Sequence, residues 1–255
     1  MDNLSNISFV FSLITIVLYF VGYILSKEKL QKFSIFTIFI SAFLLFVYII
    51  LYLLKAKRFI LTNQFETVLL MLELIYIINF YFYFKLSKNI NILFPTVIIS
   101  PAFLGILNLI DKDIKPLMPA LKSNWLIFHV LSSMISYSFF AIAGIYGMVF
   151  FILKNMQKFD EYIHKAIKVG FVFLTIGIIT GAIWAESAWG RYWSWDPKET
   201  WSLITWFFYA VILHLKRKGI SEKTFALLLF FGFLFVIFTY FGVNYLLGGL
   251  HSYAR

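Results

Sequence analysis

The stretch ISFVFSLITIVLYFVGYIL, residues 7–25, carries no charged side chain and is long enough to cross the hydrocarbon core of a bilayer as a helix. It has no basic segment before it and no small-residue cleavage site, so we expect a retained span and not a cleaved signal peptide. Similar runs recur along the chain, which is 62% hydrophobic and only 13% charged. Soluble domains are about 45–50% apolar and about 25% charged. The sequence therefore predicts an all-α, polytopic membrane helical bundle.

The apolar runs between clusters of charged residues predict about eight transmembrane helices. No internal repeat or flexible linker divides the chain, so we expect a single transmembrane domain over residues 1–255. Pro95 and Pro101 predict that the fourth span is kinked or partly re-entrant. The expected spans are residues 7–25, 33–54, 65–84, 90–110, 125–153, 166–185, 200–215 and 224–247.

The distribution of charge predicts sidedness and excludes several functions. The net charge of +10 comes from short Lys and Arg clusters between apolar runs, which indicates contact with anionic membrane lipid and not nucleic acid. With eight spans, 13 of the 22 basic residues fall on one side, which we expect to face the cytoplasm. Both termini and the loop between the sixth and seventh spans then lie outside the cytoplasmic (inner) membrane, in the periplasm. The absence of cysteine excludes disulfides, thiolate metal sites and iron–sulfur clusters.

A tryptophan-rich segment follows the sixth span. Residues 189–201 read WGRYWSWDPKETW, and six of the seven tryptophans fall between positions 184 and 206. Aromatic belts in membrane proteins are spread over all helix ends, whereas these indoles are concentrated in one external loop at about residues 184–201. Stacked indoles form a flat surface suited to a planar aromatic ligand. We therefore expect this loop to be a binding surface.

Local signals within the loop have both structural and binding interpretations. Asp196, followed by Pro197 and then Glu199, matches an N-cap, a proline at the first helical position and a capping-box acid. Capping does not exclude a second role for Asp196.

The remaining loop residues are candidates for direct ligand contact. Gly190 would allow the backbone to approach a ring closely. Arg191 and Lys198 could pair with the carboxylates of a ligand, although Lys198 could equally extend to the membrane surface. The aromatic candidates are Trp189, Trp193 and Trp195.

The four histidines are separated by the expected topology. His129 and His251 lie at the outer face together with the tryptophan loop, whereas His214 lies near the cytoplasmic end of the seventh span. Two imidazoles beside aromatic walls are an arrangement that holds haem iron, and a third histidine at membrane depth could hold haem elsewhere. His164 lies among charged residues in a cytoplasmic loop, where a solvated surface role is favoured. The metal-ligand candidates are therefore His129, His251 and His214.

The third span carries two carboxylates one heptad apart. Glu66 and Glu73 share a helix face, and Glu73 is deep enough to face the interior of the bundle. Structural hydrogen bonding and protonation both remain open for Glu73.

The tryptophan-rich signature and its flanking motifs resemble the CcsA (ResC-like) family of cytochrome c biogenesis proteins, within the tryptophan-rich haem-handling superfamily. The first 55 residues match only as apolar spans. The matching segments are Asn63 to Thr67, Phe128 to Val130 with Ser136 and Tyr137, Trp189 to Trp201, Tyr209 to His214, and Phe241 to Ala254.

This resemblance implies a function and a set of site residues. His129 and His251 would flank the iron of external haem b, His214 would help to bind haem within the membrane, and Glu66 belongs to the outer motif. The protein would relay haem across the membrane and present it to the CXXCH motif of apocytochrome c. A CcsB (ResB-like) membrane protein would be its partner, making this chain the haem-handling half of a haem lyase complex; whether the chain is itself an enzyme stays open.

Three alternatives compete with this hypothesis. A HemX-like protein shares the tryptophan signature and is linked to control of tetrapyrrole synthesis. A b-type cytochrome subunit would pass electrons to quinone, but its paired histidines usually lie within the membrane and not at one surface. A solute transporter gives no reason for the concentration of tryptophan.

Overall fold

The computed structural model describes residues 2–87, 89–150 and 160–251, and this part of the chain is helical without any strand. The chain divides into two compact units. Unit 1 comprises residues 1–60 and 65–114, and unit 2 comprises residues 61–64 and 115–255. The expectation of a single domain over residues 1–255 stays a prediction beside this division.

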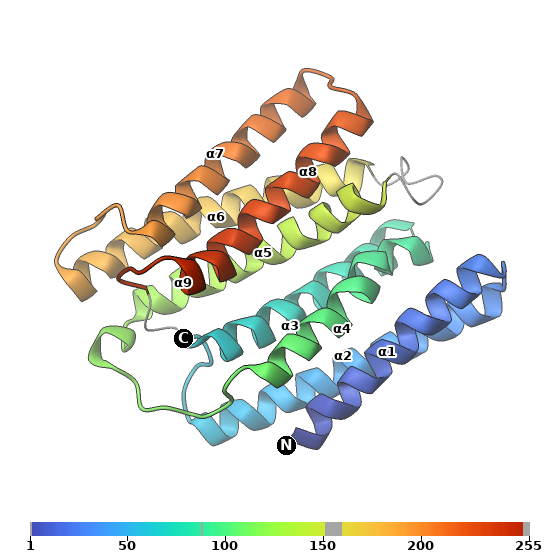
Figure 1. The fold of residues 1–255 in the computed structure, drawn as a ribbon, viewed down its shortest axis with the longest axis horizontal. Helices are drawn as coiled ribbons and strands as arrows, with labels where there is room; N and C mark the ends of the chain where they lie inside the picture. Colours follow the sequence, from blue (N-terminus) through green and yellow to red (C-terminus); the bar gives the residue numbers. More distant parts are fainter. Residues whose placement is uncertain (1, 88, 151–159, 252–255) are drawn as a thin grey trace. The chain divides into compact units, whose positions relative to one another are not determined.

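Unit 1 is built from the first four helices (Figure 1). A π-helical turn and a short 3₁₀ helix connect the third helix to the fourth. The elements are α1 (Asp2–Ile24), α2 (Glu28–Ala56), α3 (Gln64–Phe82), η1 (Tyr83–Ser87), η2 (Ile90–Leu93) and α4 (Phe94–Leu109).

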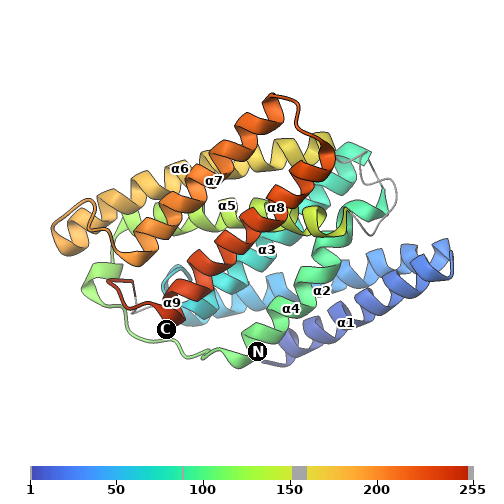
Figure 2. The same ribbon diagram turned by 45° about the horizontal axis from the view of Figure 1, so that its top comes forward.

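Unit 2 contains the later helices, with α5, α6, α7 and α8 running side by side in both Figure 1 and Figure 2. Its last helical turns are π-helical and then α-helical. The elements are η3 (Pro119–Leu121), α5 (Asn124–Val149), α6 (Asp160–Trp189), α7 (Pro197–Arg217), α8 (Glu222–Ile237), η5 (Phe238–Gly242) and α9 (Val243–Leu246).

The predicted helical membrane bundle is confirmed. In the described part of the chain, seven helices are long and apolar enough to cross a membrane. The expected span 200–215 is also helical, as part of α7, but its indoles and its charged ends make this 21-residue helix less apolar than the other seven. Residues 151–153, the predicted end of the fifth span, lie outside the described residues.

Helix α4 shows how its two prolines are accommodated. Pro95 lies in the first turn, where a backbone N–H has no intrahelical partner to lose. Pro101 lies inside the helix, so the ladder of backbone hydrogen bonds lacks one donor there. The fourth span is therefore helical from Phe94 to Leu109.

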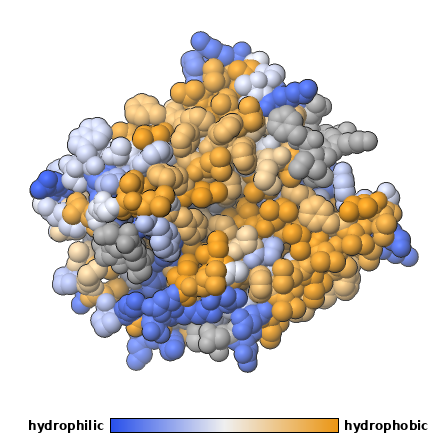
Figure 3. Space-filling model, viewed as in Figure 1, coloured by the Kyte–Doolittle hydropathy of each residue, from blue (hydrophilic) through white to orange (hydrophobic). Residues whose placement is uncertain are grey.

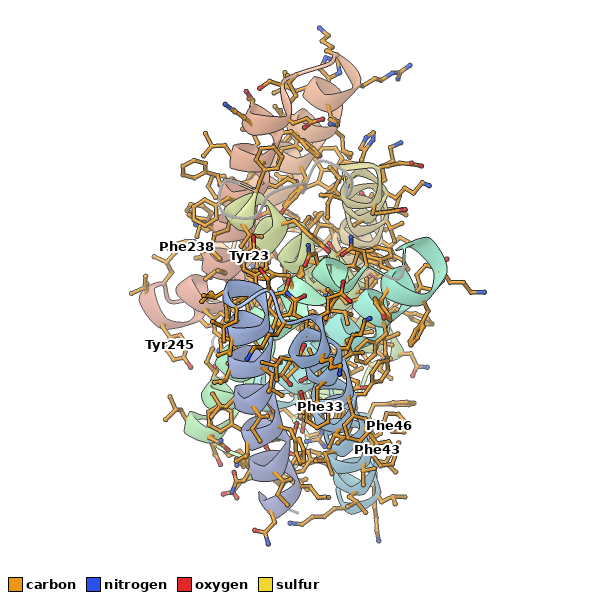
Figure 4. The ribbon with its side chains drawn as sticks, turned by 90° about the vertical axis from the view of Figure 1, so that its right-hand side faces the viewer. Tyr23, Phe33, Phe43, Phe46, Phe238 and Tyr245 are labelled. Carbon is orange, nitrogen blue, oxygen red and sulfur yellow. The ribbon has the colours of Figure 1, made fainter. Side chains whose placement is uncertain are left out.

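The interior of unit 1 contains polar as well as apolar side chains, and large apolar side chains also lie on its surface. Helix α1 packs against α2 and α4, and the rings of Phe39 on α2 and Phe80 on α3 stack with centroids 4.0 Å apart. Phe33, Phe43 and Phe46 are exposed and project from α2 in Figure 4. The corresponding surface of α1 and α2 is largely apolar in Figure 3, at the lower right. Such a surface suits lipid and not water.

The packing of unit 2 depends on close approach between α5 and α8. Helix α5 packs against both α6 and α8, and α7 packs against α6 and α8. A Cβ atom at Gly147 of α5 would collide with the carbonyl oxygen of Ala226 on α8. Small residues at this crossing let the two helices approach closely, as is usual inside membranes. This crossing holds α8 against α5, the helix that carries His129.

Candidate functional site

The connection between α6 and α7 uses two residues with positive φ. Gly190 ends α6 with φ of 74°, and its amide donates to the carbonyl of Glu186 at 2.8 Å. Trp195 also has a left-handed backbone, with φ of 58°. A Cβ atom at Gly190 would meet nothing within 4 Å. The turn itself therefore explains this glycine, and the expected close approach to a ligand ring stays a prediction.

The predicted start of α7 at Asp196 is confirmed. The carboxylate of Asp196 accepts from the amide of Lys198 at 3.1 Å, and Oε2 of Glu199 accepts from the amide of Asp196 at 3.2 Å. These bonds form a capping box, with Pro197 in the first turn. They satisfy amides that would otherwise lack partners at the helix N-terminus.

Asp196 also holds His251, far along the chain. Its Oδ2 atom lies 2.8 Å from His251 Nδ1, and its Oδ1 atom accepts from the amide of Leu250 at 2.5 Å. A Cβ atom at Gly249 would collide with Asp196 Oδ1, so glycine permits this approach. Because Nδ1 faces the carboxylate, iron coordination by His251 would fall to Nε2.

The surroundings of Asp196 favour its charged form. Burial opposes ionisation, but the hydrogen bond from His251, the charge of that ring and the amides of Leu250 and Lys198 outweigh it and lower the pKa of the carboxyl. A charged carboxylate strengthens the bond to His251 Nδ1 and raises the basicity of the opposite ring nitrogen.

His129 on α5 is oriented in a parallel way by α6. Its Nδ1 atom lies 2.7 Å from the carbonyl oxygen of Gly177, which can only accept a hydrogen bond, so Nδ1 carries the proton in the neutral ring. A Cβ atom at Gly181 would lie 2.6 Å from His129 Nδ1. The ring therefore lies directly against the backbone of α6, and Nε2 is the nitrogen left for a metal.

Trp184 lies beside both histidines. Its ring centroid is 6.1 Å from that of His129, with the rings nearly parallel, and 5.8 Å from that of His251. The indole is only 1% exposed and donates through Nε1 to the carbonyl of Ala120 at 2.9 Å. Trp189 meets His251 edge-on at 5.0 Å. The structure thus brings the two predicted outer ligands together around one buried indole.

The tryptophans do not form the flat stack expected from the sequence. Trp184 and Trp189 meet at 65°, and Trp193 and Trp195 meet at 90°. Trp195 is 69% exposed. Such edge-on contacts are ordinary for aromatic pairs, so any planar ligand would meet ring edges as well as faces.

The last two tryptophans of the cluster belong to helix packing. Trp201 packs on Phe238 with ring centroids 4.3 Å apart. Trp206 donates through Nε1 to Thr175 Oγ1 at 2.8 Å. Both lie in α7, where they contact other helical segments of unit 2 and are not part of the loop.

A half-buried cation lies near the start of α7, before the expected span 200–215. The ammonium group of Lys198 donates to Asn244 Oδ1 at 2.8 Å. Burial lowers the pKa of Lys198 to about 8, and the charge of Asp196 partly offsets this effect. The other basic candidate, Arg191, is exposed. Of these two basic candidates, Lys198 is therefore the one whose position is fixed by a contact in unit 2.

The remaining candidates make other contacts. His214 is exposed in the last turn of α7, about 27 Å of helix from Asp196. Glu66 belongs to unit 1 and is 0% exposed, and Arg58 binds its two oxygens at 2.8 and 3.0 Å. His164 contacts the edge of Phe225. Residues 252–254 of the C-terminal motif lie outside the described residues.

The arrangement suits an iron porphyrin better than a bare metal ion. In the described part of the chain, no group of three or more His, Asp or Glu side chains is placed to hold a metal ion. Haem needs only axial ligands from the protein, and each histidine here has its Nδ1 atom directed at an oxygen. The donor set therefore fits haem.

Comparison with known proteins identifies the family. A model of the family described as "Cytochrome C assembly protein" matches residues 4–251. The chain belongs to this family. CcsA, a cytochrome c biogenesis protein of Mesostigma viride, is 35% identical over 295 residues, covering 98% of this chain and 95% of that protein. CcsA of Chlamydomonas reinhardtii is 45% identical over 155 residues, covering 56% of this chain and 44% of that protein.

Two further comparisons reach longer proteins. NrfI of Wolinella succinogenes is 45% identical over 160 residues, covering 57% of this chain and 18% of NrfI. The solved structure of the cytochrome c haem lyase CcmF superposes with a TM-score of 0.69 at 16% identity, covering 94% of this chain and 46% of CcmF. At that identity the likeness shows a shared fold alone, and the chain spans less than half of CcmF.

The cytochrome c assembly protein described here is an integral membrane protein that functions in cytochrome c maturation, in a family that handles haem. The family does not fit the alternatives of a b-type electron-transfer subunit or a solute transporter.

Two contacts at the site were not predicted from the sequence: Asp196 with His251, and His129 with the glycines of α6. Asp196 and His251 are far apart in the chain, and the capping motif gave a sufficient reason for the aspartate. Gly177 and Gly181 lie on one face of a helix, as their spacing of four shows, but nothing in the sequence says that an imidazole lies against them.

Proposed function

We propose that this protein binds haem b in unit 2, with His129 and His251 as axial ligands, and presents it to apocytochrome c. The observation that carries the proposal is that both imidazoles direct Nδ1 to an oxygen atom, Gly177 for one and Asp196 for the other. This fixes the ring tautomers and leaves Nε2 for iron in both cases. When bound, haem supplies the vinyl groups to which the cysteines of a CXXCH motif add.

The protein's own groups orient the cargo and neutralise its charge. Lys198 is a held cation that can pair with a propionate, and the exposed Arg191 can reach a second one. Trp189, Trp193 and Trp195 offer aromatic surface around the connection. Gly190 gives the connection its turn.

Absorption spectra test the ligands. The purified protein should carry non-covalent, low-spin haem with two imidazole ligands. His129→Ala or His251→Ala should weaken haem retention or give a high-spin spectrum, and added imidazole should partly restore the low-spin form. His164→Ala is the matched control and should leave the spectrum unchanged. Unaltered spectra in both ligand variants would remove these residues as ligands.

The proposal extends to a relay of haem across the membrane with a CcsB (ResB-like) partner. His214 is exposed at the other end of α7, so a second ligand at that depth can come from another protein. His214→Ala should lower cytochrome c maturation in cells that contain the partner, and haem supplied from outside should bypass the defect. Normal maturation in that variant would make His214 an interfacial residue only.

Sidedness is tested by labelling single cysteines introduced into this cysteine-free chain. A cysteine at Ser194 should react with an impermeant maleimide in intact cells, since the loop is proposed to face the periplasm. A cysteine at Ser221 should react only after the cells are made permeable. The reverse pattern would contradict the outward direction of haem delivery across the inner membrane.

In the proposed complex, this chain and apocytochrome c contribute different chemical groups. This chain would supply the haem-handling half of a haem lyase complex, while apocytochrome c supplies the thiols. The HemX-like alternative predicts haem binding without maturation. A deletion strain that keeps normal levels of holocytochrome c would therefore favour that alternative.

A further inference from the structure

Unit 1 contains a buried row of hydroxyl groups that the haem site does not use. On α1 the buried polar residues repeat every three or four positions, which places them on one helix face. Thr15 shares a hydrogen bond of 2.7 Å with Thr37 on α2. The members of this face are Ser5, Ser8, Ser12 and Thr15.

One part of this row continues to α3. Ser8 Oγ donates to the backbone carbonyl of Ser41 at 2.8 Å and lies 3.0 Å from Ser41 Oγ. The hydroxyl of Tyr76 on α3 then lies 2.9 Å from Ser41 Oγ. Tyr76 is fully buried. A chain of three hydroxyls therefore runs from α1 through α2 to α3.

Glu73 lies one helical turn before Tyr76 on the same helix. Residues three apart on a helix are neighbours on its surface, so the two side chains lie beside each other. Glu73 is 9% exposed, and its Oε2 atom has no hydrogen-bond partner in the described part of the chain. It is about nine residues, or roughly 14 Å of helix, from the start of α3. This carboxyl group thus lies deep within a membrane-spanning helix.

Glu66 provides a direct contrast on the same helix face. Its carboxylate binds Arg58 through two hydrogen bonds, so its charge is compensated. Among the described residues of α1 to α4, no Lys or Arg lies at the depth of Glu73. The other charged side chains of α1 to α4 lie at helix ends: Asp2, Glu28, Lys29, Lys32 and Lys55.

Apart from the charged residues just named, the titratable side chains of α1 to α4 are phenols. They carry no charge near neutral pH and cannot compensate a carboxylate. Helix α4 contributes no titratable side chain. The tyrosines of the other three helices are Tyr19, Tyr23, Tyr48, Tyr52, Tyr76 and Tyr81.

A buried carboxyl group without a cation is stable only when it is neutral. Removal of an unpaired carboxylate from water costs several kcal/mol even after relaxation, whereas a protonated carboxyl needs only hydrogen-bond partners. Asn79 Oδ1, two turns further along α3 from Glu73, is likewise buried without a partner. Unpaired buried polar atoms of this kind are commonly satisfied by internal water.

We propose that Glu73 is a proton-binding site within the membrane, protonated at neutral pH, which exchanges its proton through Tyr76, Ser41 and Ser8. Ser8 is six residues, or roughly 9 Å, inside the N-terminal end of α1, so this chain of hydroxyls approaches one end of the helix. The ligand of the site is a proton, held together with internal water. The site uses none of the histidines proposed to bind haem.

Dicyclohexylcarbodiimide tests the protonation state in the full-length protein in membranes. This apolar reagent adds to a protonated carboxyl group: the acid proton moves to a carbodiimide nitrogen as the carboxyl oxygen bonds to the central carbon. Mass spectrometry of peptides should find the adduct at Glu73 and not at Glu66, its salt-bridged control on the same helix. A water-soluble carbodiimide should label the exposed Glu28 and leave Glu73 unlabelled.

Infrared spectroscopy gives a readout that needs no reagent access. The carbonyl band of a protonated carboxyl should be present at neutral pH, absent in Glu73→Gln and retained in Glu66→Gln. Absence of the band from the wild-type protein, or its persistence in Glu73→Gln, overturns the site. Lack of the dicyclohexylcarbodiimide adduct at Glu73 together with labelling by the water-soluble reagent would also overturn it.

The exchange path has its own matched variants. Tyr76→Phe removes the middle hydroxyl, so the Glu73 band should shift more slowly after transfer to heavy water. Thr37→Val removes a hydroxyl of the same buried row outside the path and should leave the exchange rate unchanged. Equal rates in wild type and Tyr76→Phe would refute exchange through this chain.

Discussion

Replacement of Asp196 by asparagine tests whether this carboxylate orients the proposed haem ligand. The two oxygens of Asp196 accept three hydrogen bonds, from Leu250 at one atom and from His251 and Lys198 at the other. Asparagine has one acceptor oxygen and one NH₂ donor. Whichever way the amide is turned, its NH₂ group faces at least one N–H donor, so the three hydrogen bonds cannot all be reproduced.

The size of the effect follows from what is lost and what is kept. Asparagine is as good an N-cap as aspartate, so α7 should still begin at the same residue. The His251 ring loses a charged partner, and loss of such a partner typically lowers metal affinity about 10–100-fold. This corresponds to about 1.4–2.8 kcal/mol of binding free energy. A high-spin fraction should appear because one axial ligand is held less firmly.

Haem titration followed by absorption gives the dissociation constant, and thermal unfolding gives stability. Glu199→Ala is the matched control, because Glu199 completes the capping box but binds the amides of Ser194 and Asp196 instead of His251. It should lower stability and leave haem affinity near the wild-type value. Equal haem affinity in Asp196→Asn and wild type, or an equal loss in both variants, would refute the role assigned to Asp196.

Three further variants test other contacts. Gly181→Ala places a methyl group 2.6 Å from Nδ1 of His129, so low-spin haem should be lost by absorption spectroscopy while the helical circular dichroism is retained. Arg58→Met removes the guanidinium that binds both oxygens of the buried Glu66 carboxylate, and thermal or denaturant unfolding should show a loss of about 3–5 kcal/mol. Lys198 has a pKa of about 8, so its attraction for a propionate is present below that pH and is lost above it. Haem affinity measured against pH should therefore fall through pH 8 in wild type and stay flat in Lys198→Met.

The fold could be predicted well from the sequence because a membrane span is recognised by the average composition of about twenty consecutive residues. Runs such as residues 7–25 need no knowledge of their neighbours to be recognised as helices. The start of α7 was equally accessible, since the spacing of Asp196, Pro197 and Glu199 is a local signal. Helix α7 shows where this recognition is weaker. Its indoles pack within unit 2 and charged residues lie at both of its ends, so the helix is less apolar than the other seven.

The site was predicted only in part because its contacts join distant residues. Topology placed His129 and His251 on one face, but the bond to Asp196 depends on how the C-terminal turn folds back. The concentration of tryptophan suggested a flat surface. In the structure Trp184 is instead a buried hydrogen-bond donor, and Trp206 fills the interface between helices. Composition identifies indoles but not their angles.

The length of α7 is itself part of the proposed haem route. Asp196, the N-cap, and His214 are 18 residues apart, which is five turns at 3.6 residues per turn, so their backbone positions lie on the same side of the helix. Insertion of one residue midway would rotate His214 by about 100° relative to Asp196 and displace it by only about 1.5 Å. The sequences around Asp196 and His214 would be unchanged, but the two residues would no longer lie on the same side of the helix. The number of residues in α7 therefore sets both the distance between Asp196 and His214 and their relative direction around the helix axis.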